Sequence, residues 1–333
     1  MNYRSVADLN AEARRLAHRL PKDIDLVVGI PRSGLLAANL LCLHLDRPMT
    51  DVDGLVEGRI LKSGYRFEAG QRLADVDRVL VIDDSVASGR QMRDTKGRIR
   101  DEDLPYDIEY AAIYISPEGY QHVDHWGAVV ERKRVFEWNL MHHPLLQNFC
   151  VDIDGVLCRD PTDEENDDGE RYREFVRTVD PQVVPSKRIG WLVTSRLEQY
   201  REETEAWLAE HGIEYDELVM MDHPSAEARR EAGDHGQYKA EVYASTDANL
   251  FVESSHWQSV EIVEETGKPV YCYDTNELLT PDTLAQVEAK SRSYAAKFAA
   301  EPVGFSIRAG RYVAQRGWHG LNRLTSERGR GSD

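Results

Sequence analysis

Short apolar runs, each long enough for one buried strand, alternate along the chain with longer segments in which apolar residues recur at helical spacing. The runs that we expect to form parallel strands are 24–29, 79–82, 108–115, 149–153, 188–193, 218–221 and 249–252. Helices are expected over 6–18, 35–45 and 197–211. Strands that alternate with helices predict an α/β fold with parallel sheets.

The chain is long enough for two such domains, because its 333 residues exceed the usual size of one compact core. We expect a first domain over 1–146 and a second over 147–280, each a doubly wound parallel sheet. A C-terminal helix and a basic tail are expected over 281–333. The tail either docks on the acidic body or a second subunit, or stays partly disordered.

An acid pair and a loop of small residues follow the apolar run at 79–82. Asp83 and Asp84 come where that strand should end, and the next five residues are Ser85, Val86, Ala87, Ser88 and Gly89. Backbone N–H groups at a loop and a helix start bind phosphate, and serine hydroxyls add donors. Carboxylates accept hydrogen bonds from sugar hydroxyls, usually beside a divalent cation. The pattern therefore predicts a ligand that carries a phosphate and a cis-diol.

A second anion-binding loop follows the run at 24–29. It reads Gly-Ile-Pro-Arg-Ser-Gly over 29–34 and leads directly into the helix expected at 35–45. Arg32 adds a fixed positive charge to the N–H groups of this helix start. Alone the motif is weak, since a Pro-Gly turn has the same composition. Its pairing with the acidic strand downstream makes it informative.

These two stretches resemble the signature of type I phosphoribosyltransferases, which bind 5-phosphoribosyl-1-pyrophosphate. The resemblance implies that Asp83 and Asp84 hold the ribose hydroxyls and that 85–89 hold the 5-phosphate. It also implies that the pyrophosphate lies on the loop that contains Arg32, Ser33 and Gly34. In relatives that loop contains a cis peptide bond, which here falls between residues 31 and 32.

The resemblance is less complete in the segments that would close over the pyrophosphate and bind the base. Segment 51–75 corresponds to the family's mobile loop, where Lys62 is a candidate pyrophosphate contact. Trp138 is the candidate for stacking on a base; the alternative is an aromatic of the core or of a domain interface. Ser116 stands where purine-specific relatives offer a lysine, and Gln91 where the family has a serine or threonine. The sequence therefore does not identify the base.

Two aspartates mark the start of the second domain. Asp152 and Asp154 stand two apart where the apolar run at 149–153 ends, and Gly155 permits a sharp turn. Two such carboxylates can share one magnesium ion and still play separate roles. The first attacks phosphorus as a nucleophile, and the second protonates the leaving oxygen and later activates water.

This Asp-Ile-Asp-Gly-Val-Leu run resembles motif one of the haloacid dehalogenase superfamily, most of whose members are phosphatases. The resemblance implies a role for Thr194 in binding the phosphoryl group and for Lys239 in balancing charge. It also implies a Mg²⁺ site made of Asp152, Asp154 through its backbone, and Glu253, with water. The family usually presents two acids where this chain has only Glu253. The gaps between the motifs are too short for a full cap domain, so we expect a minimal cap.

The amino-acid composition limits the kinds of partner that this protein is expected to bind. The formal net charge of −18 argues against nucleic-acid binding, because phosphate backbones would be repelled. The four cysteines show neither metal-ligand spacing nor a disulfide framework. The sequence contains no signal peptide and no apolar run of membrane length, so we expect a cytoplasmic protein without a membrane partner. A homo-oligomer is left open.

These observations predict a bifunctional enzyme. The first domain would transfer phosphoribosyl from 5-phosphoribosyl-1-pyrophosphate to a nitrogenous base, and the second would dephosphorylate the resulting nucleoside monophosphate. Both would use Mg²⁺. Two alternatives stay open at this point: a phosphatase regulated by a non-catalytic first domain that senses the donor, or a protein that binds nucleotides without turnover.

Overall fold

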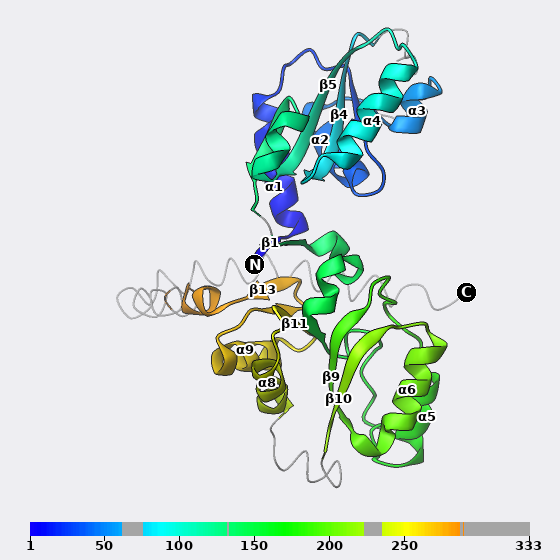
Figure 1. Ribbon diagram of the computed structural model, residues 1–333, viewed down its shortest axis with the longest axis vertical. Coiled ribbons are helices and arrows are strands. Elements are labelled where there is room, and N and C mark those ends of the chain that lie inside the picture. The colour runs from blue at the N-terminus through cyan, green and yellow to red at the C-terminus, as the bar shows by residue number, and fades with distance from the viewer. Residues whose placement is uncertain (62–75, 132, 223–234, 287–288, 290–333) are drawn as a thin grey trace, which may run out of the picture.

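The computed structural model describes residues 1–61, 76–131, 133–222, 235–286 and 289. Figure 1 shows two α/β bodies, one built from the N-terminal half of the chain and the other from the C-terminal half. Each contains its own sheet, and helices lie on both faces of each sheet. The α/β class with parallel sheets is therefore confirmed.

The first sheet has five strands in the order β3-β2-β4-β5-β6, all parallel. These strands are β3 (Met49–Asp51), β2 (Leu26–Gly29), β4 (Arg78–Val86), β5 (Asp107–Ile115) and β6 (His125–Val129). Helices α1 (Val6–Arg19) and α2 (Gly34–Leu45) cover one face, and α3 (Val52–Val56) and α4 (Arg90–Asp101) the other. Buried leucines of α1 and α2 share a cluster with Val27 and Leu80, whereas Met92 and Ile99 of α4 pack with Val79 and Val81.

The second sheet has six strands in the order β10-β9-β8-β11-β12-β13. They are β10 (Tyr215–Met221), β9 (Ile189–Leu197), β8 (Phe149–Val151), β11 (Leu250–Glu253), β12 (Val270–Cys272) and β13 (Glu277–Leu279). All pairs are parallel except β12 with β13. Helices α5 (Glu170–Thr178) and α6 (Arg201–Glu210) pack on one face, and α8 (His235–Ser245) and α9 (His256–Thr266) on the other.

The segment between the two sheets is packed rather than free. Strands β1 (Asn2–Arg4) and β7 (Arg134–Phe136) form a parallel pair, followed by the short helices η4 (Glu137–His142) and η5 (Pro144–Asn148). Leu140 and Met141 of η4 lie in the core of the second sheet, although they precede the boundary expected at 146. The Tyr3 hydroxyl donates to the Asn276 carbonyl at 2.9 Å, so the N-terminal strand also contacts the second half.

Several predicted boundaries differ from the structure. β4 was expected to end before Asp83 but runs to Val86, because Asp83 and Ser85 continue its pairing with β5. Likewise β9 continues through Thr194 to Leu197, so the helix expected from 197 begins only at Arg201. The described part of segment 51–75, which the resemblance matched to a mobile loop, contains α3. Residues 281–286 are helical, and the rest of the C-terminal segment lies almost wholly outside the described residues.

All four cysteines are buried and free. Within the described ranges, no helix is both long and apolar enough to cross a membrane.

Candidate active sites at the carboxyl ends of two sheets

The first candidate site forms where β2 and β4 lie side by side. Gly29 pairs with Ile82, and the Ile30 N–H donates to the Ile82 carbonyl at 3.0 Å, so the loop after β2 runs against the acid pair. Gly34 makes this approach possible, because a Cβ there would lie 2.9 Å from Asp83 Oδ1 and 3.0 Å from the Ile82 carbonyl oxygen. The peptide bond between Pro31 and Arg32 is cis, as the family resemblance implied.

Asp83 and Asp84 are both buried, with 8% and 4% of their surface exposed. Oδ1 of Asp83 accepts a hydrogen bond from the Asp84 N–H at 2.9 Å. Burial, together with the neighbouring Asp84 carboxylate, raises the pKa of Asp83 to about 8. Arg134 opposes this shift from beyond ion-pair distance, and in the described part of the chain neither aspartate has an ion pair.

Trp138 takes part in this site in a way that sequence reasoning missed. Its indole N–H donates to Asp84 Oδ2 at 2.8 Å, and its ring stacks on Phe136 with centroids 4.8 Å apart. Its predicted stacking on a base remains a prediction. Nothing in the spacing of the chain could have indicated the hydrogen bond, because the two residues are 54 positions apart.

The small-residue loop lies between the end of β4 and the start of α4. Ser85 and Val86 still belong to the strand, Ala87 and Ser88 are exposed, and Gly89 has a φ of 69°. A Cβ at Gly89 would also lie 2.0 Å from a His122 ring carbon, so glycine is needed for both reasons. The 12-residue helix α4 begins directly after this loop, and the N–H groups of a helix start suit an anion.

Of the other predicted contacts to the donor, Arg32 is exposed and Ser33 is half-buried immediately before α2. Both stand on the loop that borders the acid pair. Lys62 lies outside the described residues.

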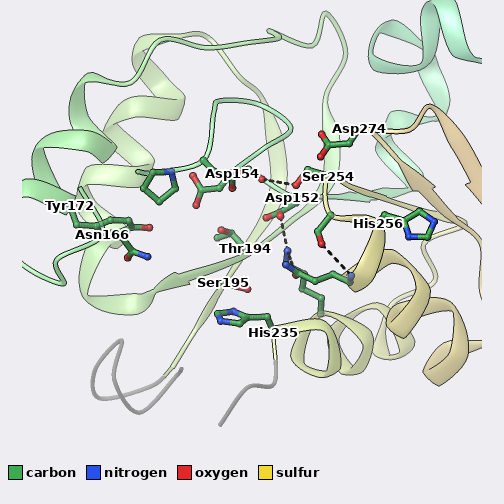
Figure 2. Close-up of a pocket in the computed structure, with 15 residues that line it drawn as sticks. Asp152, Asp154, Asn166, Tyr172, Thr194, Ser195, His235, Ser254, His256 and Asp274 are labelled. Carbon is green, nitrogen blue, oxygen red and sulfur yellow. Dashed lines mark hydrogen bonds and ion pairs between the residues drawn. The ribbon is translucent and has the colours of Figure 1, made fainter. Parts of the chain in front are cut away.

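The second candidate site, in which Figure 2 labels Asp152 and Asp154, is built around Lys239. This lysine extends from α8, and its Nζ donates to Asp152 Oδ2 at 2.6 Å, to Glu253 Oε2 at 2.7 Å and to Gln258 Oε1 at 2.9 Å. The two acids come from the ends of the adjacent strands β8 and β11. Lys239, Asp152 and Glu253 are each at least 96% buried. The three predicted site residues Lys239, Asp152 and Glu253 therefore form one hydrogen-bonded cluster. Gln258 belongs to the same cluster and was not predicted.

Burial controls the charges of this cluster. It raises the pKa of Asp152, although the ammonium of Lys239 acts in the opposite direction. Burial also disfavours a charged lysine, but Asp152 and Glu253 outweigh it and hold the pKa of Lys239 above its usual value. The cluster therefore contains its own counter-charge.

A cavity of about 400 Å³ opens over this cluster. Its walls include the predicted residues Asp152, Asp154, Thr194 and Lys239, with Ser195, Ser254, His235 and His256 around them. Asp160 and Asp274 also line it, and burial together with nearby carboxylates raises the pKa of Asp160. Gly155, with a φ of 78°, turns the chain away from β8, and a Cβ there would lie 2.3 Å from Ser254 Oγ.

Asp154 is held by a residue that the sequence reasoning did not single out. Arg196 Nη2 donates to Asp154 Oδ1 at 2.7 Å, and Arg196 Nε lies 3.1 Å from Oδ2. Burial alone would lower the pKa of Arg196, but Asp154 more than offsets it, so the pKa of Arg196 is raised. An arginine three residues after the apolar run 188–193 was the one signal in the sequence, since a buried charge needs a partner.

The donor set suits a hard cation in its chemistry, since Asp152, Glu253 and the Asp154 carbonyl all supply oxygen. The side chain of Asp154, however, faces Arg196 and not the other two acids. In the part of the chain that the structure describes, no group of three His, Cys, Asp or Glu side chains could hold a metal ion. The predicted set depends on two carboxylates and one carbonyl, so this observation leaves it as a prediction.

No protein-family model matches the chain, and no curated protein matches it. Among solved structures, a xanthine-guanine-hypoxanthine phosphoribosyltransferase from Helicobacter pylori is 14% identical with a TM-score of 0.33, covering 41% of this chain and 92% of that one. A purine phosphoribosyltransferase from Pyrococcus horikoshii is 21% identical with a TM-score of 0.31, over 41% and 92%. An orotate phosphoribosyltransferase from Aeropyrum pernix is 19% identical with a TM-score of 0.27, over 37% and 71%.

Proposed function

We propose that this chain is a bifunctional enzyme, with a phosphoribosyltransferase domain over 1–146 and a haloacid dehalogenase-like phosphatase domain over 147–280. For the first, the supporting observation is the close approach of the loop at 30–34 to the acid pair, which Gly34 permits. For the second, it is the convergence of Asp152 and Glu253 on Lys239 under an open cavity.

In the first site, each part of the donor would bind protein groups of complementary charge or hydrogen-bonding character. The ribose hydroxyls of 5-phosphoribosyl-1-pyrophosphate donate to Asp83 and Asp84, and the 5-phosphate accepts from the N–H groups and hydroxyls of 85–89. The pyrophosphate lies on the loop with Arg32, whose guanidinium balances its charge as it leaves. The nitrogen of the base then forms the new bond to C1 of the ribose as the bond from C1 to the pyrophosphate oxygen breaks.

In the second site, Asp152 attacks the phosphorus of a nucleoside monophosphate, and the bond from phosphorus to the 5′-oxygen breaks. Asp154 gives that oxygen a proton, and later takes one from the water that hydrolyses the phosphoenzyme. The Thr194 hydroxyl donates to a phosphoryl oxygen. Lys239 remains between Asp152 and Glu253, where it offsets the negative charge that the phosphate brings.

Magnesium belongs to this proposal at both sites. In the phosphatase it would be held by Asp152, Glu253 and the Asp154 carbonyl, and beside Asp83 and Asp84 it would accompany the donor. It would supply positive charge that neutralises phosphate oxygens when bound. The proposed partners are small molecules, and neither nucleic acid nor a membrane is among them; a cytoplasmic location is proposed with them.

The two reactions form a sequence. Transfer yields a nucleoside 5′-monophosphate and pyrophosphate, and removal of the 5′-phosphate makes the first step irreversible. The test is to incubate the protein with donor, Mg²⁺ and a panel of bases while measuring pyrophosphate and phosphate separately. The wild type should form a nucleoside, whereas Asp152→Asn should stop at the monophosphate. A mutant that still yields nucleoside would show that dephosphorylation occurs elsewhere.

One observation favours a second candidate, in which the first domain senses the donor and regulates the phosphatase. Trp138 donates to Asp84, and the same short helix η4 buries Leu140 and Met141 in the core of the second sheet. A ligand that displaces Trp138 from Asp84 would act directly on a segment packed in the second domain. Phosphatase activity that changes with donor in the absence of any base, with no pyrophosphate released, would favour this candidate.

A further inference from the structure

The Arg196 side chain is fully buried, with 0% of its surface exposed, and it is not among the residues that line the cavity. It lies on β9 two residues after Thr194 and is anchored on several sides. Nη1 donates to Thr204 Oγ1 at 3.4 Å, Nη2 also donates to Cys158 Sγ at 3.3 Å, and the guanidinium lies over the Trp207 ring at 5.9 Å. The position of its donors is therefore set by the core of the second domain.

The two oxygens of Asp154 accept different numbers of hydrogen bonds. Oδ1 accepts from Arg196 Nη2 at 2.7 Å and Nε at 3.2 Å, and from Cys158 Sγ at 3.4 Å. Within the described residues, Oδ2 accepts only from Arg196 Nε, at 3.1 Å. The side chain is still 18% exposed and lines the cavity (Figure 2). Oδ1 therefore accepts from three donors and makes the shortest contact with the arginine, whereas Oδ2 accepts from one donor and keeps more capacity to accept from a ligand.

We propose that Arg196 is a positioning residue for the phosphatase reaction: it holds Oδ1 of Asp154 so that Oδ2 is the oxygen that gives and takes the proton. This inference rests on the proposed phosphatase function. An arginine suits the task because its planar, forked donors fix both the place and the plane of a carboxylate. Lysine offers a single point charge and would leave the carboxylate free to rotate.

The competing explanation is that the pair only stabilises the core. Both explanations expect Arg196→Met to lower stability, since the substitution leaves Asp154 half-buried without its partner. They differ in what happens once Asp154 has already been changed. A residue that acts through Asp154 has little left to contribute in an Asp154→Asn background, whereas a purely structural residue lowers activity by the same factor in either background.

The experiment is a double-mutant cycle on p-nitrophenyl phosphate with saturating Mg²⁺, using Arg196→Met, Asp154→Asn and the double variant of the full chain. Nitrophenol needs little protonation to leave, so Arg196→Met should still form the phosphoenzyme and show a rapid-quench burst. Its steady turnover should fall about 10²-fold, within the range that general acid–base catalysis contributes. The double variant should turn over within about threefold of Asp154→Asn, close to full non-additivity.

Two further variants control for folding. Arg196→Lys keeps a charge in the core and should recover part of the turnover while KM stays close to that of the wild type. Arg173→Met is the matched control, because Arg173 also lies over an aromatic ring, that of Tyr200, and pairs with an acid, Glu203. Arg173 is not part of the cavity wall, so this variant should retain wild-type turnover within about twofold.

The possible outcomes distinguish a failure of the phosphatase proposal from a failure of the proposed role of Arg196. A wild type that releases no nitrophenol overturns the phosphatase proposal itself. An active wild type with additive losses in the cycle overturns only the role of Arg196. If Arg196→Met fails to fold, the Arg196→Lys variant decides: turnover equal to the wild type contradicts the proposal, and a reduced turnover with a retained burst supports it.

Discussion

Two acid clusters stand at equivalent places in the two sheets, at the carboxyl ends of inner strands, but they are neutralised differently. Asp83 and Asp84 have no ion pair in the described part of the chain, and the pKa of Asp83 is raised to about 8. Asp152 and Glu253 share Lys239, and Asp154 is paired with Arg196. The second cluster is assembled with its counter-charges, whereas in the first the two acids lie close together without one, so that Asp83 holds its proton up to about pH 8.

The difference has a physical meaning for ligand binding. Buried carboxylates without a counter-charge are unfavourable until a positive group arrives, so the first cluster should be stabilised by its ligand. The second cluster is already satisfied, so removing one member of it should damage the fold itself. Substitutions in the two clusters should therefore differ in kind, with losses of stability in the second and losses of affinity in the first.

Removing the shared cation of the second cluster should have the largest effect. Lys239→Met leaves Asp152 and Glu253 buried without a counter-charge, which should cost about 3–5 kcal/mol of unfolding free energy and abolish phosphate release. Urea denaturation at neutral pH measures the loss. Lys268→Met removes donors to the Tyr243 and Thr246 carbonyls and a cation–π contact with the Tyr243 ring; it is the control and should cost about 1–2 kcal/mol. Equal losses in the two variants would contradict the proposed contrast.

Removing the charges of the first cluster should weaken binding without weakening the fold. Each change, Asp83→Asn and Asp84→Asn, removes one charge-assisted acceptor, at a cost of about 1.5–3 kcal/mol, or roughly 10- to 150-fold in affinity. Titration calorimetry with 5-phosphoribosyl-1-pyrophosphate and Mg²⁺ measures this. The double variant should leave the proposed phosphatase activity unchanged. Unchanged donor affinity in the double variant would remove the phosphoribosyltransferase assignment.

The contact between the loop and the acid pair can be tested at Gly34. Gly34→Ala places a methyl group 2.9 Å from Asp83 Oδ1, so we expect overpacking that costs about 1–3 kcal/mol and a weaker affinity for the donor. Gly97→Ala on α4 meets nothing within 4 Å and should instead stabilise by about 0.5–1 kcal/mol. Thermal melts compare the pair, and a Gly34→Ala variant as stable as Gly97→Ala would contradict the close approach of the loop to Asp83.

The pH dependence of stability tests the contrast through its sign. Because the pKa of Asp83 in the fold is about 8 against a usual 3.8, its contribution is fully present below about pH 4 and is lost as the pH rises through 8. Asp83→Asn should therefore melt like the wild type at pH 4 and higher at pH 8, by about 2–4 °C for each kcal/mol. Asp23, whose pKa is lowered by Arg78, has the opposite sign, so Asp23→Asn should gain nothing at pH 8.

The sequence by itself determined much of this arrangement. Apolar runs bounded by acids and glycines predicted the inner strands of both sheets, since a buried parallel strand must be apolar on both faces. The same logic located both acid clusters, because parallel strands end at one edge of a sheet. Lys239 and Glu253 were singled out by the family resemblance, and the structure brings them to within 2.7 Å of each other. Strand ends were predicted too early, since pairing with a neighbour carries polar residues such as Asp83 and Thr194 into a strand.

Only the tertiary structure decided which partner each acid receives. Asp154 meets Arg196 across 42 residues of sequence, and Asp84 meets Trp138 across 54. Such pairs depend on the direction in which a side chain leaves its strand and on the packing of a neighbouring helix, and neither is encoded in local periodicity. Charge balance in a buried site is a property of the assembled core, because a carboxylate interacts with whatever lies within a few ångströms, however distant that residue is along the chain.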